Sequence, residues 1–148
     1  MTARFSIDGI SISGDHFIGG RRIASSETFE DRTPLDWTRK LASVSKGDKE
    51  IANEAITSAA EAFEEWSERS FLERASYMNR LADLIDSNIK TLAHIECLDM
   101  AMLLDSLQKR VIPRAARNFR VYSKMAQDYE ERCWESNGTQ NRVTRMPA

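Results

Sequence analysis

Two cysteines and one histidine are the residues that could support nucleophilic chemistry. Cys97 and Cys133 lie far apart and belong to no Cys-x-x-Cys pair, so the sequence supports neither a zinc knuckle nor a redox dithiol. His94 precedes Cys97 by three residues and could share its helix face, as a Cys–His pair would require. Because free cysteines usually behave as small buried hydrophobes, we expect two reduced thiols at helical positions.

Acidic side chains follow one another along a predicted first helix. They are Glu54, Glu61, Glu64 and Glu65. Carboxylates at such spacing could act as acids or bases, but nothing apolar or cationic nearby in sequence indicates a shifted pKa. We therefore expect a solvated face.

Basic side chains recur every three or four residues on a later helix. They are Lys109, Arg110, Arg114, Arg117 and Arg120. Such a strip could contact the phosphates of a nucleic acid, which leaves binding of that kind open as a weaker hypothesis. Compensating charge nearby, at Asp105 and over 130–132, favours a solvated face instead.

Composition narrows the classes of partner. The 148 residues carry 21 Lys and Arg against 23 Asp and Glu, a net charge of -2, so no bulk attraction to nucleic acid or anionic lipid is expected. The sequence contains no signal-peptide pattern, no apolar run of membrane-spanning length and no glycine-rich phosphate loop. These features predict a cytoplasmic chain of one domain, or part of one, with neither nucleic acid nor membrane as partner.

The elements that must position these groups are mainly helical. Residues 70–102 carry apolar side chains at steps of three and four, which predicts one long amphipathic helix. Ser70 and Glu73 form a capping box at its start. A first helix is expected to begin after the N-cap Asp48, and a third to run on from residue 103, where Pro113 either kinks it or lies in the first turn of a new helix.

Short strands are expected at both ends of the chain. Residues 16–18 and 21–23 flank Gly19-Gly20, which predicts a hairpin, and 40–44 alternates like a strand with one wet face. Asn137-Gly138 is a turn signal, and 142–146 reads as an opening strand without a partner strand. The predicted fold class is mainly α with an N-terminal β-hairpin and short strands.

In order and spacing, several segments resemble the N-terminal portion of the NAD(P)-dependent aldehyde dehydrogenase family. The matching text is His16-Phe17-Ile18-x-Gly20, Thr28-Phe29-Glu30-Asp31 with Pro34, Ala62-Phe63-x-x-Trp66, Glu73-Arg74-Ala75, Arg80 to Ile85, Glu96-Cys97-Leu98-Asp99, Pro113 to Tyr122, and Arg142-Val143-x-Arg145-x-Pro147. The resemblance covers nearly the whole chain and implies the N-terminal part of the family's α/β fold.

The resemblance implies three segments, in an enzyme that oxidises an aldehyde to a carboxylic acid with NAD or NADP. Residues 1–47 would form the N-terminal strands and hairpin, 48–135 helices that pack on a cofactor-binding domain, and 136–148 the start of an oligomerisation-arm strand. The chain would be roughly the first third of a subunit. The oxyanion-hole Asn, the general-base Glu and the nucleophilic Cys would follow later, so no catalytic or cofactor-binding residue is assigned to this chain.

The resemblance also implies one minor site. Some family members hold a structural monovalent cation at positions that resemble Asp31 and Asp99, with the backbone carbonyl of Arg32, and hard oxygen ligands suit such an ion. The sequence departs from the family pattern nearby, since Leu-Asp-Asn-Gly-Lys-Pro is replaced by 98–103, Leu-Asp-Met-Ala-Met-Leu.

Two hypotheses follow. The first is an aldehyde dehydrogenase fragment, inactive alone, whose partners are the remainder of the enzyme or the other subunits of a homo-oligomer. The alternative is a non-catalytic helical module that self-associates, because amphipathic helices and an unpaired strand would leave apolar surface to cover.

Overall fold

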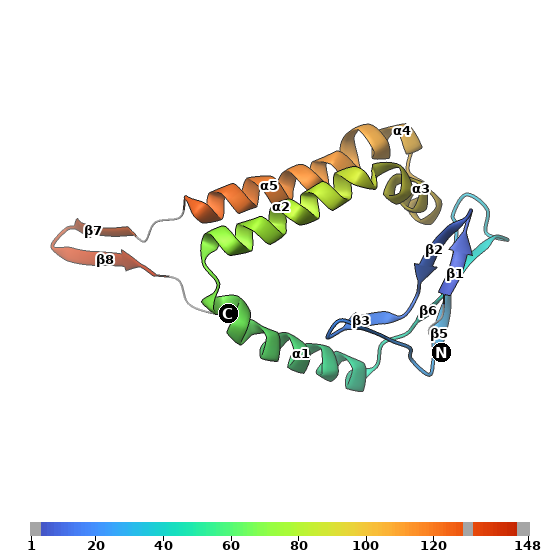
Figure 1. Ribbon diagram of the computed structural model, residues 1–148, viewed down its shortest axis with the longest axis horizontal. Helices are drawn as coiled ribbons and strands as arrows, with labels where there is room; N and C mark the ends of the chain where they lie inside the picture. The colour runs from blue at the N-terminus through green and yellow to red at the C-terminus, as the bar shows by residue number, and fades with distance from the viewer. Residues whose placement is uncertain (1–3, 129–131, 145–148) are drawn as a thin grey trace.

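The computed structural model describes residues 4–128 and 132–144. About half of the chain is helical, and the rest of the regular structure consists of antiparallel pairs of short strands (Figure 1). The predicted mixture of helices with short strands is therefore confirmed. None of the helices in this described part is both long and apolar enough to cross a membrane.

The first two helices begin where the sequence predicts. Helix α1 spans Lys49–Glu68, and Asp48 accepts a hydrogen bond of 2.8 Å from the backbone N–H of Ile51. Helix α2 spans Phe71–Ser87, and its capping box is complete. Ser70 Oγ accepts from the Glu73 N–H at 3.2 Å, and the Glu73 carboxylate accepts from the Ser70 N–H at 2.8 Å. Both caps satisfy backbone donors that a helix start leaves without partners.

The prediction of a single helix over 70–102 is wrong, because the helix is interrupted at Asn88. Helix α3, Ile89–Met100, starts anew after this residue, whose φ of -115° and ψ of 16° are not helical. The Asn88 side chain donates to the Leu84 carbonyl at 2.8 Å and so closes the end of α2. Residues 86–88 are Asp, Ser and Asn, whose short polar side chains compete for backbone hydrogen bonds and weaken helices.

The third helical segment is a composite. It contains a short helix α4 (Leu104–Ser106), a π-helical turn η1 (Leu107–Val111) and helix α5 (Ile112–Gln127). Pro113 is the second residue of α5, but the backbone is helical without interruption from residue 104 to 127, so Pro113 lies within a continuous helical run just after a π turn. A proline clashes with the carbonyl four residues earlier, and the wider π turn just before Pro113 relieves that crowding.

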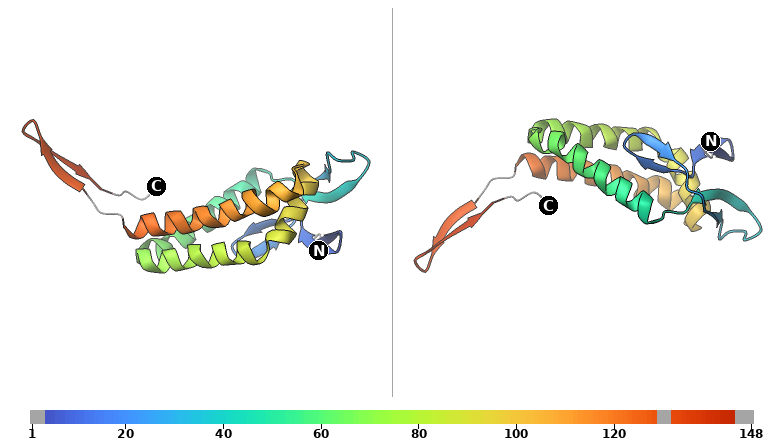
Figure 2. Two further views of the ribbon diagram at one scale, coloured as in Figure 1. Left: turned by 90° about the horizontal axis from the view of Figure 1, so that it is seen from above. Right: turned by 90° about the horizontal axis from the view of Figure 1, so that it is seen from below.

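Helices α2 and α5 lie side by side and run in opposite directions (Figures 1 and 2). Their contact is lined by small buried residues, Ala75 and Ala82 of α2 with Ala116 and Ser123 of α5. The Ser123 hydroxyl lies 3.4 Å from the Ala75 carbonyl, to which it donates. Small side chains let the two helix backbones approach closely.

The N-terminal strands form three pairs. They are β1 (Arg4–Ile7) with β2 (Ile10–Ser13), β3 (His16–Ile18) with β4 (Arg21–Ile23), and β5 (Thr28–Arg32) with β6 (Lys40–Ser45). The hairpin predicted across Gly19-Gly20 is confirmed as β3–β4, and both glycines have the positive φ that such a turn requires. The strand predicted over 40–44 is confirmed as part of β6.

A hydrophobic core joins these strands to α3. Ile7 of β1, Leu41 and Ala42 of β6, and Leu98 of α3 are buried together. Adjacent strand residues normally point to opposite faces, yet Leu41 and Ala42 are both buried. The reason is a bulge, since Asp31 pairs with Ala42 and Arg32 pairs with Lys40, which leaves Leu41 as the extra residue.

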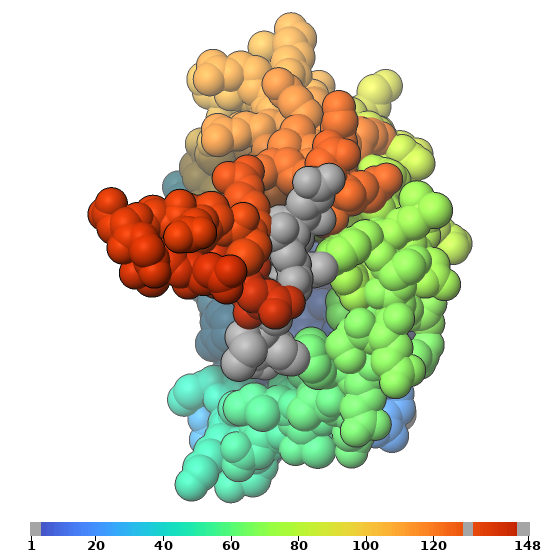
Figure 3. All heavy atoms as spheres, turned by 90° about the vertical axis from the view of Figure 1, so that its left-hand side faces the viewer, coloured from blue at the N-terminus to red at the C-terminus, as the bar shows by residue number. Residues whose placement is uncertain are grey.

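The C-terminal strand has a partner that sequence reasoning missed. Strand β8 (Thr139–Val143) pairs antiparallel with β7 (Arg132–Ser136) across Asn137-Gly138, whose φ values of 53° and 75° suit a tight hairpin turn. The prediction that this strand is unpaired is therefore wrong, because its partner β7 precedes it in the chain. The hairpin extends away from the helices (Figures 1 and 3). Residues 145 and 146 of the predicted strand, and Tyr129 of the predicted helix stripe, lie outside the described residues.

Candidate functional site

The structure does not form the Cys–His pair. His94 Nε2 lies 3.0 Å from Asp8 Oδ2, so the imidazole bonds to a carboxylate. Cys97 is half-buried on α3, while Cys133 is exposed in strand β7 and not on a helix as expected. Both thiols are free, and neither is buried as the sequence interpretation supposed.

The acidic side of α1 is a solvated face, as expected. Glu54, Glu61, Glu64 and Glu65 are all exposed. Glu65 pairs with Arg69 four residues on, which is an ordinary helix-surface arrangement.

The basic strip on η1 and α5 is partly neutralised. Arg120 contacts Asp83 at 2.6 Å and Asp86 at 2.8 Å, both on α2. Lys109 pairs with Asp105 at 2.5 Å. The remaining basic residues, Arg110, Arg114 and Arg117, are exposed. Arg120 therefore links α5 to α2. Because its guanidinium is paired with two carboxylates, it is a poor candidate for binding phosphate.

Asp31 and Asp99 are brought together from separate elements. Asp31 lies near the end of β5 and Asp99 near the end of α3, and both line one pocket of about 420 Å³ beside the core. Burial raises the pKa of Asp31, and the charge of Asp99 and a hydrogen bond to its side chain raise it further. Facing carboxylates repel one another when both are ionised, so the pair favours either a shared proton or a cation.

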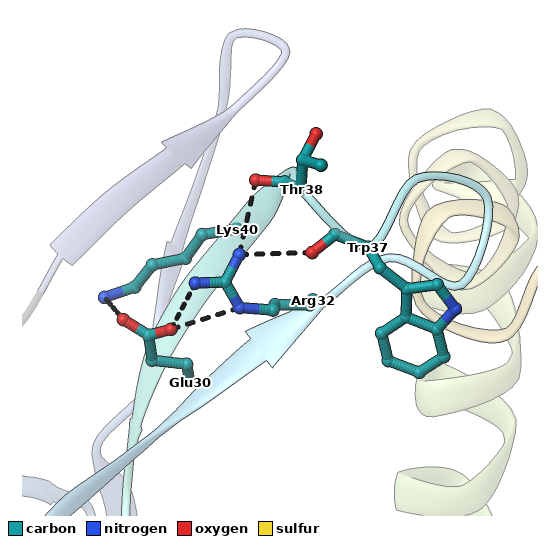
Figure 4. Close-up of polar contacts among 5 residues, drawn as sticks. All are labelled: Glu30, Arg32, Trp37, Thr38 and Lys40. Atoms are coloured by element: carbon teal, nitrogen blue, oxygen red, sulfur yellow. Dashed lines mark hydrogen bonds and ion pairs between the residues drawn. The ribbon is translucent and has the colours of Figure 1, made fainter.

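The side chain of Arg32, next to Asp31 in sequence, forms hydrogen bonds that stabilise the turn between β5 and β6 (Figure 4). Its guanidinium donates to Glu30 Oε2 at 2.6 and 3.1 Å, and to the carbonyls of Trp37 and Thr38 at 3.2 Å each. Lys40 reaches the other oxygen of Glu30 at 3.1 Å. Hydrogen bonds from Lys40 and Arg32 lower the pKa of Glu30. The network fixes the turn over 33–39 and, with it, the backbone at the bulge.

Sequence reasoning missed one cluster near this pocket. The Asp8 carboxylate accepts from Arg39 Nη2 at 2.6 Å and bonds to His94 at 3.0 Å, and these two contacts lower the pKa of Asp8. Residues 8 and 9, Asp-Gly, are a turn signal, and both have positive φ. That signal predicts the turn but says nothing of partners that lie 31 and 86 residues away.

The oxygen atoms of this region are suited to binding a cation. Two carboxylates with a backbone carbonyl are the hard ligands that alkali and alkaline-earth cations prefer. Over residues 4–128 and 132–144, no three side chains of His, Cys, Asp or Glu converge to hold a metal ion. A cation here would therefore depend on backbone oxygens as well as on the aspartates.

Comparison with known proteins identifies the family. The family model described as "Aldehyde dehydrogenase family" matches residues 22–148. The chain belongs to the aldehyde dehydrogenase family. Among relatives of this aldehyde dehydrogenase chain, the 5-carboxymethyl-2-hydroxymuconate semialdehyde dehydrogenase of Escherichia coli is 34% identical over 113 residues, which are 76% of this chain and 24% of the relative. The aldehyde dehydrogenase family 2 member C4 of Arabidopsis thaliana is 36% identical over 70% of this chain and 21% of its own length.

Solved aldehyde dehydrogenases share the fold of this chain. An indole-3-acetaldehyde dehydrogenase of P. syringae, solved with NAD+ and IAA, has a TM-score of 0.81 at 30% identity and covers 88% of this chain with 27% of its own. The aldehyde dehydrogenase KauB of Pseudomonas aeruginosa has a TM-score of 0.82 at 28% identity over 87% of this chain and 27% of its own. The chain thus spans about a quarter of the length of these relatives, somewhat less than the predicted third.

Proposed function

We propose that this chain is the N-terminal part of an enzyme that oxidises an aldehyde to a carboxylic acid with NAD or NADP. The observation that carries the proposal is the extent of the match, which covers most of this chain but about a quarter of each relative. Relatives solved with NAD+ support a nicotinamide cofactor for the whole enzyme. No residue of this chain is assigned to catalysis or to the cofactor.

The exposed apolar side chains of α1 support a larger whole. Helix α1 contains no buried residue, and Ile56, Phe63 and Trp66 are 67%, 42% and 39% exposed. Large apolar residues on a helix normally mark the face that another element covers. We propose that the remainder of the enzyme covers α1, and that β7–β8 belongs to the arm that joins subunits.

The proposal places the reacting groups outside this chain. The oxyanion-hole Asn, the general-base Glu and the nucleophilic Cys would all lie in the remaining three quarters of the subunit. Cys97 and Cys133 are not candidates, since neither has a base within reach among the contacts of the described residues: His94, the nearest histidine in sequence, bonds to Asp8. Alone, the chain is expected to be inactive.

We also propose a structural monovalent cation between Asp31, Asp99 and the backbone carbonyl of Arg32. The shared pocket of the two aspartates and the raised pKa of Asp31 support this site, because a cation would offset the repulsion between the carboxylates. Arg32 follows Asp31 in β5 but does not line this pocket, so its backbone carbonyl is included on the resemblance alone.

The length of the native protein tests the main proposal. Intact-mass measurement on the protein from its source, together with a reading of the gene past codon 148, is expected to give a subunit about four times as long as this chain. A native protein that ends at Ala148 would remove the enzyme interpretation.

A self-associating helical module is the second candidate. It is favoured by apolar side chains that stay exposed on the α2–α5 pair, namely Leu84, Val121, Tyr122 and Met125. Light scattering and hydrophobic-dye binding on the 148-residue chain test this candidate. A stable, dispersed monomer that binds no dye would exclude a self-associating module.

A further inference from the structure

Asp8 joins three segments that are distant in the sequence. It lies in the turn between β1 and β2, and its carboxylate contacts Arg39, which precedes β6, and His94, on α3. The family model begins to match only at residue 22, so this turn belongs to the part of the chain that precedes the match.

We propose that Asp8 is a positioning residue that sets the distance between Asp31 and Asp99, by holding α3 and the turn over 33–39 on one carboxylate. The inference rests on the cation site proposed above, of which it would be the outer support. Asp8 itself would not touch the cation.

The path from Asp8 to each aspartate is short. On one side, Arg39 closes the turn that begins at the bulge, because the Thr33 N–H donates to the Arg39 carbonyl at 3.3 Å and the Arg39 N–H donates to the Asp36 carbonyl at 2.9 Å. Thr33 is itself buried, only two residues from Asp31. A shift of Arg39 would therefore move the end of β5.

On the other side, His94 and Asp99 belong to the same helix. His94 lies in the middle of α3 and Asp99 one residue before its end. The contact of His94 with Asp8 therefore helps to fix the position of the helix that carries Asp99. Ile7, next to Asp8 in sequence, packs in the core with Leu98, next to Asp99. The ion pairs of Asp8 and the core contact of Ile7 therefore both hold α3 against the strands, from neighbouring residues of the chain.

The backbone at Asp8 allows a clean test. Its φ of 49° is in the left-handed region, where glycine carries no steric penalty and asparagine is well tolerated. Asp8→Gly removes the carboxylate and keeps the turn. Asp8→Asn keeps one acceptor oxygen without the charge. Asn137→Gly makes a comparable change in the β7–β8 turn, where φ is 53°. It serves as the matched control, because among the described contacts Asn137 forms no ion pair with a distant segment.

Two readouts on the 148-residue chain decide the matter. The first is the NOE between the methyl groups of Leu98 and Leu41, which reports how α3 is seated on β6. The second is the midpoint of a sodium chloride titration followed at the Ile95 methyl, with tetramethylammonium chloride holding the ionic strength constant. Among the described contacts, Asp8 touches none of the proposed ligands directly and its two ion pairs are partly exposed, so its removal should weaken sodium binding only a few-fold.

We expect Asp8→Gly to weaken the Leu98–Leu41 NOE and to raise the sodium midpoint about two- to fivefold, Asp8→Asn to recover part of both effects, and Asn137→Gly to change neither. Unchanged values in a folded Asp8→Gly chain would overturn the role of Asp8, and Asp8→Asn decides if the glycine variant does not fold. If the unaltered chain shows no saturable response to sodium, the cation site fails, and the NOE alone still decides whether Asp8 seats α3.

Discussion

The strand-rich end of the molecule and helix α1 differ in what covers their apolar side chains. At the strand-rich end, Ile7, Leu41 and Leu98 come from three elements and bury one another. In α1, a helix of 20 residues, no residue is buried and Ile56 and Phe63 stand exposed. The strand-rich end has a small core of its own, whereas α1 keeps its large apolar side chains exposed and only Trp66, among its aromatic residues, contacts a ring of another described helix, Tyr77 of α2.

This difference agrees with the proposal that α1 packs against a part of the enzyme outside this chain. The core between the strands and α3 is made by Ile7, Leu41, Ala42 and Leu98. Helix α1 has good caps, but a helix in water gains most of its stability from packing. The chain therefore has a small core of its own and an exposed apolar face on α1, which we propose the rest of the enzyme covers.

The largest expected effect is on the core. Leu98→Ala should lower the free energy of unfolding of the 148-residue chain by about 3 kcal/mol, because it removes buried methyl groups and leaves a cavity. Ile56→Ala on α1 should change it by less than about 0.5 kcal/mol, as expected for an exposed site. Urea denaturation measures both. Equal losses at the two sites would erase the proposed contrast.

The helix caps sharpen the comparison. Ser70→Ala should cost about 1 kcal/mol of global stability, because α2 is packed against α5 and its capping box satisfies two backbone donors. Asp48→Ala removes the equivalent cap from α1 and should instead speed hydrogen exchange in the first turn of α1, with little global change. A global loss from Asp48→Ala as large as that from Ser70→Ala would mean that α1 is already part of the cooperative unit.

A glycine substitution at the end of α3 should stabilise the core. Ala101 has a φ of 54°, which is unfavourable for a residue with a Cβ, and the family pattern has Gly at this position. Ala101→Gly should add about 1 kcal/mol to the free energy of unfolding. The same change at Ala93, buried within α3, should subtract about 1 kcal/mol or more. Identical signs for the two variants in thermal unfolding would show that residue 101 is not strained.

The pH dependence of Asp31 should give the smallest effect. The folded-state pKa of Asp31 lies above its ordinary value of 3.8, so ionisation of this group costs stability above the folded pKa, and the cost vanishes as the pH falls below 3.8. Asp31→Asn should therefore be more stable than the unaltered chain at neutral pH without added sodium, and no more stable near pH 3. A variant that is less stable at neutral pH would contradict this sign.

Local signals in the sequence predicted much of the fold because short-range chemistry sets those features. The capping box at Ser70, the cap at Asp48 and the Gly19-Gly20 turn depend on residues within a few positions of one another. The break at Asn88 was missed because the apolar periodicity continues through it, while the short polar residues over 86–88 favour non-helical hydrogen bonds. The strand β7 was missed because the helical pattern runs on towards it.

The candidate site was only partly open to prediction. Resemblance pointed to Asp31 and Asp99, and the structure places both at one pocket. No pattern could have shown that Asp8 meets Arg39 and His94, since ion pairs across 31 and 86 residues leave no periodic trace. The sequence interpretation placed Cys133 at a helical position by treating it as a small buried hydrophobe, whereas in the structure it pairs with Arg142 of β8.

The most direct test of the central claim is an assay of the purified 148-residue chain for aldehyde-dependent formation of NADH. We predict no NADH above the rate without protein, because the reacting groups of the proposed enzyme lie outside this chain. Sustained NADH formation that depends on both the aldehyde and the folded chain would contradict the account.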